Sequence, residues 1–221
     1  MSRRAWMSWS SGKDSALALH VARTELELDV RALLVTVNAD AGRIAMHAVR
    51  RSLLDAQADR LGIPVHIVEI PAHCPNELYE ARMAAATATA VADGVEHVVF
   101  GDLYLEDVRS YREGHLAGTG IAPVFPLWHR PTDALAGDML AAGVRAVLTC
   151  VDPTALAPEF AGRMFDEALL ADLPDGVDPC GERGEFHTFV FDAPGFRAPI
   201  DVEIGDRVER DGFVFCDVVP A

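Results

Sequence analysis

Apolar, strand-like runs alternate with helical patterns along most of this chain. The strand-like runs cover residues 4–10, 30–37, 64–70, 95–100 and 144–151. Between them, apolar residues recur at helical spacing in 45–61, and an alanine-rich helical pattern in 76–93 ends at Gly94. Parallel strands joined by crossover helices form sheets that are covered on both faces. We therefore expect an α/β fold with a doubly wound, Rossmann-like parallel sheet.

The pattern changes after about residue 128. Residues 125–133 carry two prolines, and another helix, a strand and a helix near 158–172 follow. The remaining residues alternate as β-strands do, with a tight turn expected at Asp211-Gly212. We predict a doubly wound domain over residues 1–128 and a smaller C-terminal α+β domain over residues 129–221.

Charge and cysteine content exclude several classes of protein. The net charge of −15 argues against a broad nucleic-acid surface, which needs clustered lysine and arginine. The four cysteines are scattered and form no C-x-x-C pair, which argues against a zinc ribbon or a redox dithiol. Apolar runs stay well short of the ~20 residues of a membrane span, and the N-terminus has no signal-peptide pattern. We expect a soluble, cytoplasmic protein.

The break in the first strand–helix pair carries the strongest chemical signal. Residues 10–15 read Ser-Ser-Gly-Lys-Asp-Ser, and Lys13 is the only lysine among 19 basic residues. Small residues between a strand and a helix allow backbone amides and the positive helix end to face a phosphate. A compact ammonium fits a tight turn better than a guanidinium does. A capped helix start with a solvated lysine is the simpler alternative.

Two other phosphate motifs do not fit the sequence. A Walker A loop needs glycine where Met7 stands and serine or threonine where Asp14 stands. Residues 118–123 follow a dinucleotide fingerprint only until Pro123 at its sixth place. Residues 10–15 therefore stay the one candidate phosphate loop.

Those six residues resemble the PP-loop, S-G-G-x-D-S, of the ATP pyrophosphatases, with Ser11 in place of the first glycine. Three further stretches, 46–64, 98–113 with 125–128, and 178–196, resemble the diphthine–ammonia ligase family of that superfamily. The resemblance covers nearly the whole chain. The PP-loop alone is moderately specific for the family, and its combination with the "GERGEFHTF" stretch is much more so.

The resemblance implies an ATP-dependent amide ligase. In such a reaction a substrate carboxylate attacks the α-phosphate of ATP, pyrophosphate leaves, and ammonia displaces AMP from the acyl adenylate. The 1–128 domain would bind ATP and the 129–221 domain the substrate. In the namesake reaction the acceptor is diphthine, but a chain rich in alanine and arginine and almost without lysine resembles a product of a GC-rich bacterium. We therefore expect an acceptor other than diphthine.

Site residues follow from the resemblance and from position in the expected sheet. Thr36, at the end of the second strand, would sit by the adenine and ribose. Gly101 and Asp102 follow another strand on the same rim, and Asp102 would bind the Mg²⁺ that ATP brings. The positions expected to bind the nucleotide are Ser10, Ser11, Gly12, Lys13, Asp14, Ser15, Thr36, Gly101 and Asp102, and Lys13 is also assigned a catalytic role. Lys13→Ala is expected to abolish ATP turnover and to spare the fold.

Acids and arginines near Asp102 admit two interpretations each. Glu106 and Asp107 would either bind the Mg²⁺ together with Asp102 or be acidic residues at the start of a helix, where negative charge is favoured. Arg109 and Arg112 lie one turn further on, as a phosphate clamp or as surface ion pairs.

The tail stretch around residues 180–187 is rich in reactive side chains and bent by two glycines. An ammonia-transferring enzyme needs a base within hydrogen-bond reach of the nitrogen, and we assign Glu185 and His187 as the catalytic candidates. For Cys180, a buried structural thiol is favoured over a thiol-relay role. His47 is favoured as a helix-face histidine over a ligand.

Two other functions stay open at this point. Other PP-loop proteins modify tRNA bases, although the acidic charge argues against that here. A non-catalytic ATP-binding sensor would share the loop but release no pyrophosphate. The expected partners are ATP, a carboxylate substrate and ammonia, without membrane or nucleic acid, and a homodimer stays open as the oligomeric state.

Overall fold

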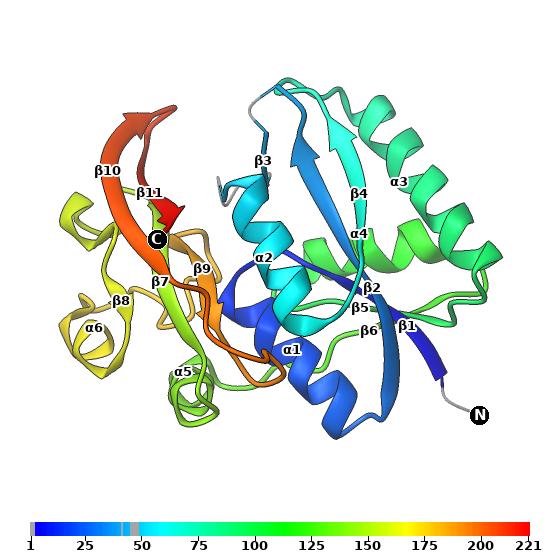
Figure 1. Cartoon of the computed structure of the whole chain (residues 1–221), viewed down its shortest axis with the longest axis horizontal. Coiled ribbons are helices and arrows are strands. Elements are labelled where there is room, and N and C mark those ends of the chain that lie inside the picture. Colours follow the sequence, from blue (N-terminus) through cyan, green and yellow to red (C-terminus); the bar gives the residue numbers. More distant parts are fainter. Residues whose placement is uncertain (1–2, 41, 45–48) are drawn as a thin grey trace.

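The computed structural model describes residues 3–40, 42–44 and 49–221, which build two β-sheets joined by a shared core (Figure 1). Five strands of the first sheet are parallel and lie in the order β4-β2-β1-β5-β6. They are β1 (Arg3–Ser8), β2 (Leu28–Asn38), β4 (Val65–Ile70), β5 (His97–Val99) and β6 (Ala122–Val124). The short β3 (Arg43–Ile44) pairs antiparallel with the end of β2.

Helices cover both faces of the parallel sheet. They are α1 (Lys13–Thr24), α2 (Arg51–Leu61), α3 (Asn76–Ala92) and α4 (Glu106–Leu116). On β1, Ala5 and Met7 pack into the core that contains α1 and α2, whereas Trp6 packs with α3 and α4. This alternation is what a strand buried on both faces requires. The predicted doubly wound α/β fold is confirmed.

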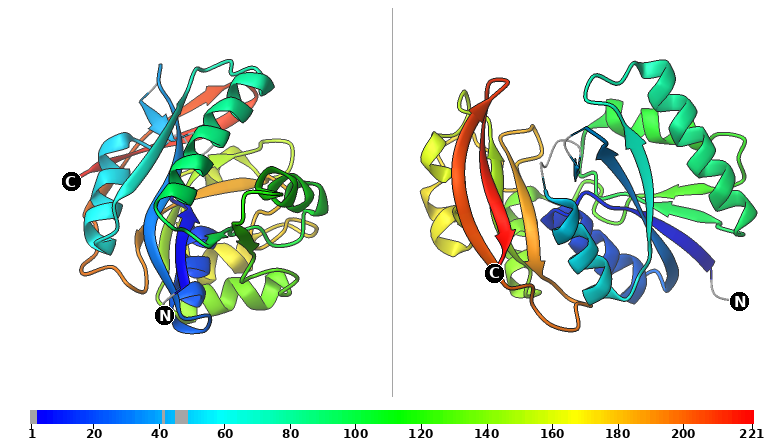
Figure 2. Two further views of the ribbon diagram at one scale, coloured as in Figure 1. Left: turned by 90° about the vertical axis from the view of Figure 1, so that its right-hand side faces the viewer. Right: turned by 45° about the horizontal axis from the view of Figure 1, so that its top comes forward.

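The second sheet is antiparallel and contains the C-terminal strands (Figure 2). Its strands are β7 (Arg145–Val151), β8 (Met164–Phe165), β9 (Phe186–Asp192), β10 (Val202–Arg210) and β11 (Phe213–Pro220), accompanied by α5 (Thr132–Ala141) and α6 (Glu167–Asp172). The strand expected at 144–151 therefore belongs to this sheet and not to the parallel one. Asp211 and Gly212 both have positive φ, at 53° and 82°, as the predicted tight turn demands.

Two predicted helices differ from the structure. Residues 158–172 form a 3₁₀ turn (Pro158–Phe160), β8 and α6 instead of one helix. Gly162 breaks the pattern: its φ is +84°, and a Cβ there would lie 2.8 Å from Cys216 Sγ. The helix predicted from residue 45 begins at Arg51, and His47 lies outside the described residues.

The carboxyl ends of β1 and β5 mark the point where the sheet order reverses, because successive crossovers leave in opposite directions from there. α1 packs against β9, so the second sheet adjoins this point (Figure 2). In the described part of the chain, the helices are all too short or too polar to cross a membrane.

Candidate nucleotide-binding site

The turn from β1 into α1 is a tight loop that ends at the amino terminus of the helix. Gly12 precedes the helix and offers no side-chain cap. Ser11 has φ 69°, in the left-handed region where glycine costs least. The Ser11 carbonyl oxygen accepts hydrogen bonds from the Val190 amide at 2.9 Å and the Gln57 side chain at 3.2 Å. The positive end of α1 is thereby fixed at the end of β1.

A cavity of about 600 Å³ opens at the carboxyl ends of β1, β2 and β5. One part of its wall, from β2, β4 and α3, is mostly apolar and includes Leu34, Thr36, Ile70, Tyr79 and Met83. The other part is mostly polar and includes Ser10, Lys13, Asp14, Ser15, Gly101, Asp102, Arg112, Glu182, His187 and Thr188. The cavity thus joins an apolar pocket to a charged one around the start of α1, and it contains most of the predicted nucleotide-binding residues.

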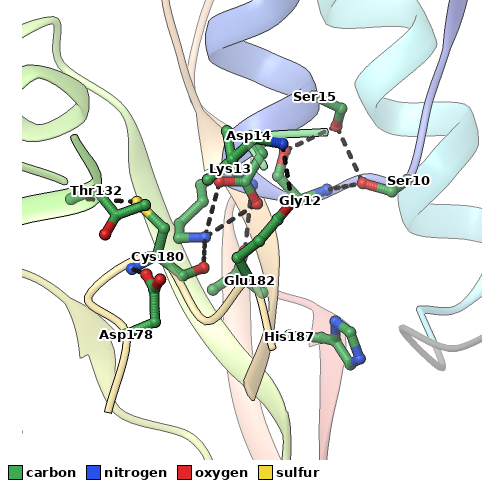
Figure 3. Close-up of polar contacts among 12 residues, drawn as sticks. Ser10, Gly12, Lys13, Asp14, Ser15, Thr132, Asp178, Cys180, Glu182 and His187 are labelled. Atoms are coloured by element: carbon green, nitrogen blue, oxygen red, sulfur yellow. Dashed lines mark hydrogen bonds and ion pairs between the residues drawn. The ribbon is translucent and has the colours of Figure 1, made fainter. Parts of the chain in front are cut away.

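Lys13 is buried, with 1% of its surface exposed, and its ammonium is already paired (Figure 3). Nζ lies 2.9 Å from the Asp14 carboxylate and donates to the Cys180 carbonyl oxygen. Burial alone would lower the pKa of Lys13, but the Asp14 carboxylate, with smaller contributions from Cys180 and Glu182, raises it overall. Lys13 is therefore charged, and its contact with the Cys180 carbonyl oxygen connects the start of α1 to the C-terminal part of the chain. It is thus not the solvated loop lysine of the simpler alternative, and the expectation that Lys13→Ala spares the fold loses its physical basis.

Residues 178–187, which we call the tail loop, close the cavity opposite α1. Glu182 Oε1 accepts the amides of Leu103 at 2.8 Å and Tyr104 at 3.3 Å. The Tyr104 hydroxyl donates to Asp178 at 2.6 Å. Burial, opposed by the two amides and assisted by the Asp14 and Asp102 charges, raises the pKa of Glu182 to about 7. The tail loop therefore places a carboxyl group that titrates near neutrality in the wall of the cavity.

Glu185, by contrast, lies outside the cavity wall and is 5% exposed. Its two carboxylate oxygens accept the amides of Asp178 at 3.0 Å and Arg183 at 2.9 Å. Both oxygens are thus used to hold the tail loop together. Glu182, three positions earlier in the same loop, lines the cavity instead, and no pattern in the sequence distinguishes the two acids. A catalytic role for Glu185 stays a prediction.

The strand-end residues after β5 take different positions. Asp102 and Arg112 line the cavity and form an ion pair at 3.3 Å. Packing also favours glycine at position 101, because a Cβ there would lie only 3.0 Å from the Ser15 amide nitrogen. Arg109 instead stacks over Phe125 and Trp128, outside the cavity. Glu106 and Asp107 are exposed at the start of α4, as the helix-end interpretation requires.

The other predicted residues divide between cavity and core. His187, on β9, lines the cavity but lies apart from the Lys13 cluster (Figure 3). Ser11 is fully buried, its hydroxyl finds no partner among the described residues, and it lies outside the cavity wall. Its contact with the nucleotide stays a prediction. Cys180 is 2% exposed, and burial raises the pKa of its thiol to about 12. The thiol is therefore buried, as expected, although the residue also borders the cavity.

The cavity could bind a metal ion only through isolated carboxylates, not through a cluster of ligands. In the described ranges, no three His, Cys, Asp or Glu side chains form a group that could hold a metal ion alone. Mg²⁺ bound to a nucleotide needs only one or two carboxylates, because the phosphates and water supply the other ligands. Asp102 and Asp14 meet that need.

Comparison with known proteins gives consistent matches to one family. The family model described as the diphthamide synthase N-terminal domain matches residues 3–120, and that of the diphthamide synthase C-terminal domain matches residues 132–218. Diphthine–ammonia ligase of Danio rerio is 30% identical over 129 residues, 56% of this chain and 51% of that protein. The Homo sapiens protein of the same name is 29% identical over 129 residues, 56% and 48% of the two chains.

The chain spans about half the length of these curated relatives. Among solved structures, the U34-tRNA thiolase NcsA from Methanococcus maripaludis is 16% identical and covers 64% of this chain and 58% of its own, with a TM-score of 0.38. That likeness is too weak to bear on fold or function.

Proposed function

The chain belongs to the diphthamide synthase family, and from that premise we propose that it is an ATP-dependent ligase that forms an amide from a carboxylate and ammonia through an acyl adenylate. The observation that supports this most directly is the cavity at the reversal point of the sheet. It joins an apolar pocket to the start of α1 and to the only lysine of the chain. Ligands of doubly wound sheets bind at this position.

In this proposal ATP lies across both parts of the cavity. The adenine and ribose occupy the apolar part beside Thr36, Ile70 and Met83. The triphosphate lies against the start of α1, where the helix dipole and first-turn amides favour anions. The Ser10 hydroxyl now donates to the Ser15 hydroxyl at 3.2 Å, and that of Ser15 donates to the Gly12 carbonyl oxygen at 2.8 Å. When the triphosphate binds, both hydroxyls would rotate to donate to phosphate oxygens.

Adenylation needs positive charge where negative charge develops. The acceptor carboxylate attacks the α-phosphorus, the bond to the bridging oxygen breaks, and pyrophosphate leaves with the electron pair. Lys13 and Arg112, which both line the cavity, would stabilise this charge. Mg²⁺ held by Asp102 would neutralise part of the triphosphate charge.

Amide formation needs a base. Ammonia adds to the acyl carbon, a proton leaves the nitrogen, and AMP departs with the electrons of the C–O bond. We assign the proton to Glu182, whose carboxyl group titrates near neutrality in the cavity wall. His187 is the second candidate, since it also lines the cavity.

Calorimetry and product analysis test the proposal. ATP should bind in a magnesium-dependent manner, and Asp102→Asn should weaken binding by about tenfold, as the loss of one charged ligand predicts. The control is Asp107→Asn, an exposed acid of the same rim. Released AMP and pyrophosphate support the ligase, whereas ADP and phosphate, or magnesium-independent binding, contradict it.

A further inference from the structure

One row of residues connects the cavity to the outer edge of the second sheet. β10, β11, β7 and β9 lie side by side in that order (Figure 1). Val208 pairs with Phe215, Phe215 with Cys150, and Cys150 with His187. Residues directly opposite each other on neighbouring strands point to the same face of a sheet. The face that presents His187 to the cavity therefore continues to Val208, about 14 Å away at the usual strand spacing.

The outer end of this row is apolar and carries one cation. Val208 is 56% exposed, although it is a large aliphatic residue at the sheet edge. The rings of Phe213 and Phe215 are half-buried and lie 6.4 Å apart. The Arg210 guanidinium lies 4.7 Å from the centre of the Phe215 ring. We call Val208, Arg210, Phe213 and Phe215 the hairpin shelf.

Arg210 is available to a ligand in a way that most arginines near the site are not. Its side chain is 55% exposed, and its ion pair, with the turn residue Asp211, is long at 3.7 Å. Arg43 and Arg50, from the facing part of the molecule, both bind Asp217 further along β11. On a chain with net charge −15, an exposed arginine over an aromatic ring favours an anion with an apolar body.

We propose that the hairpin shelf binds the acceptor of the ligase reaction, and that the acceptor is a small free acid with an apolar or aromatic body. This rests on the proposed function. The shelf holds the apolar body of the acid, Arg210 attracts its carboxylate on first contact, and the row that ends at His187 leads from there to the cavity. A folded protein substrate would need a contact of at least about 1,200 Å² in total, far more than four residues provide.

Ligand-observed saturation-transfer NMR with 4-phenylbutyrate in the presence of ATP tests the shelf. Two control probes each lack one feature of this acid: 4-phenylbutyramide is uncharged, and acetate has no aromatic group. The aromatic acid should give the strongest transfer, and Arg210→Glu and Val208→Asp should each reduce it by about tenfold. Both positions are exposed, so neither change removes a core contact.

Arg145→Glu is the matched control variant, because Arg145 also stacks over a phenylalanine, Phe191, but at the opposite end of β7. It should leave the transfer unchanged. Equal signals for the wild type and Arg210→Glu, or no signal in a chain that binds ATP, would overturn the shelf alone. A chain that fails to bind ATP in calorimetry would instead overturn the proposed function.

Discussion

The loop after β1 and the tail loop meet at Lys13, but different forces shape them. The first is set by the backbone: Ser11 in the left-handed region, Gly12 without a side chain and the end of β1 leave one path into α1. The tail loop is set by carboxylates that bind its own amides, those of Asp178 and Glu185. A motif that encodes backbone shape can be located from its residue types, whereas in the tail loop chemically identical acids build the loop or serve the cavity.

Lys13→Ala should have the largest effect, because it removes the one group that both loops share. ATP-dependent pyrophosphate release should be lost. The free energy of unfolding should fall by about 3 kcal/mol, because Asp14 and the Cys180 carbonyl oxygen lose a buried partner. Urea unfolding measured beside turnover checks both. Lys13→Arg should also be impaired. Unchanged unfolding would contradict the structural role of Lys13, and unchanged turnover would contradict its role at the phosphates.

Glu182→Gln should lower amide formation by about 10²–10⁴-fold and spare adenylation, as the loss of a general base does. The wild-type rate should rise with pH through about 7, where Glu182 ionises, and this limb should vanish in the variant. Pyrophosphate exchange into ATP reports adenylation alone. Equal loss of both half-reactions would contradict the assignment.

The same carboxyl group predicts a dependence of stability on pH. Its pKa is higher in the folded protein than in the unfolded chain, so folding favours the protonated form. The stabilisation is complete below pH 4.5 and is lost as the pH rises through about 7. Glu182→Gln, whose amide oxygen can still accept the Leu103 amide, should remove this part of the pH dependence in thermal unfolding. A wild type and variant with parallel profiles would refute it.

Glu185→Gln should show the reverse pattern, with lower stability and an intact pH–rate limb. The new amide group places an N–H against the backbone amide of Asp178 or Arg183, which should cost about 1–3 kcal/mol. Chemical denaturation compares it with Glu182→Gln. A variant that is fully stable but inactive would restore the original assignment of Glu185 as the base.

Ser11→Gly should have the smallest effect and should stabilise the protein. It relieves left-handed strain of about 1 kcal/mol and removes a buried hydroxyl that finds no partner in the described chain. Thermal unfolding measures it, with ATP binding as the control. A destabilised variant would show that the serine supports the loop in some other way.

The extent to which the sequence predicts this molecule follows the range of the forces involved. Strand and helix patterns locate β1, β2, β4 and β5, because a strand that is buried on both faces needs apolar residues at successive positions. The helix predicted at 158–172 is wrong because Gly162 lies close to Cys216, 54 positions away. The spacing of apolar residues within 158–172 does not depend on that contact and therefore cannot predict it. Glu182 is missed for the same reason, since its amide partners at 103 and 104 belong to another loop.

The central claim is that ATP binds across the start of α1, and a crystal structure of the protein soaked with ATP and Mg²⁺ tests it most directly. We predict a triphosphate, or AMP after cleavage, against the amides of residues 12–15 and the Lys13 ammonium, with the adenine beside Thr36. A nucleotide bound elsewhere, or an empty cavity at an ATP concentration that saturates binding in solution, would contradict the claim.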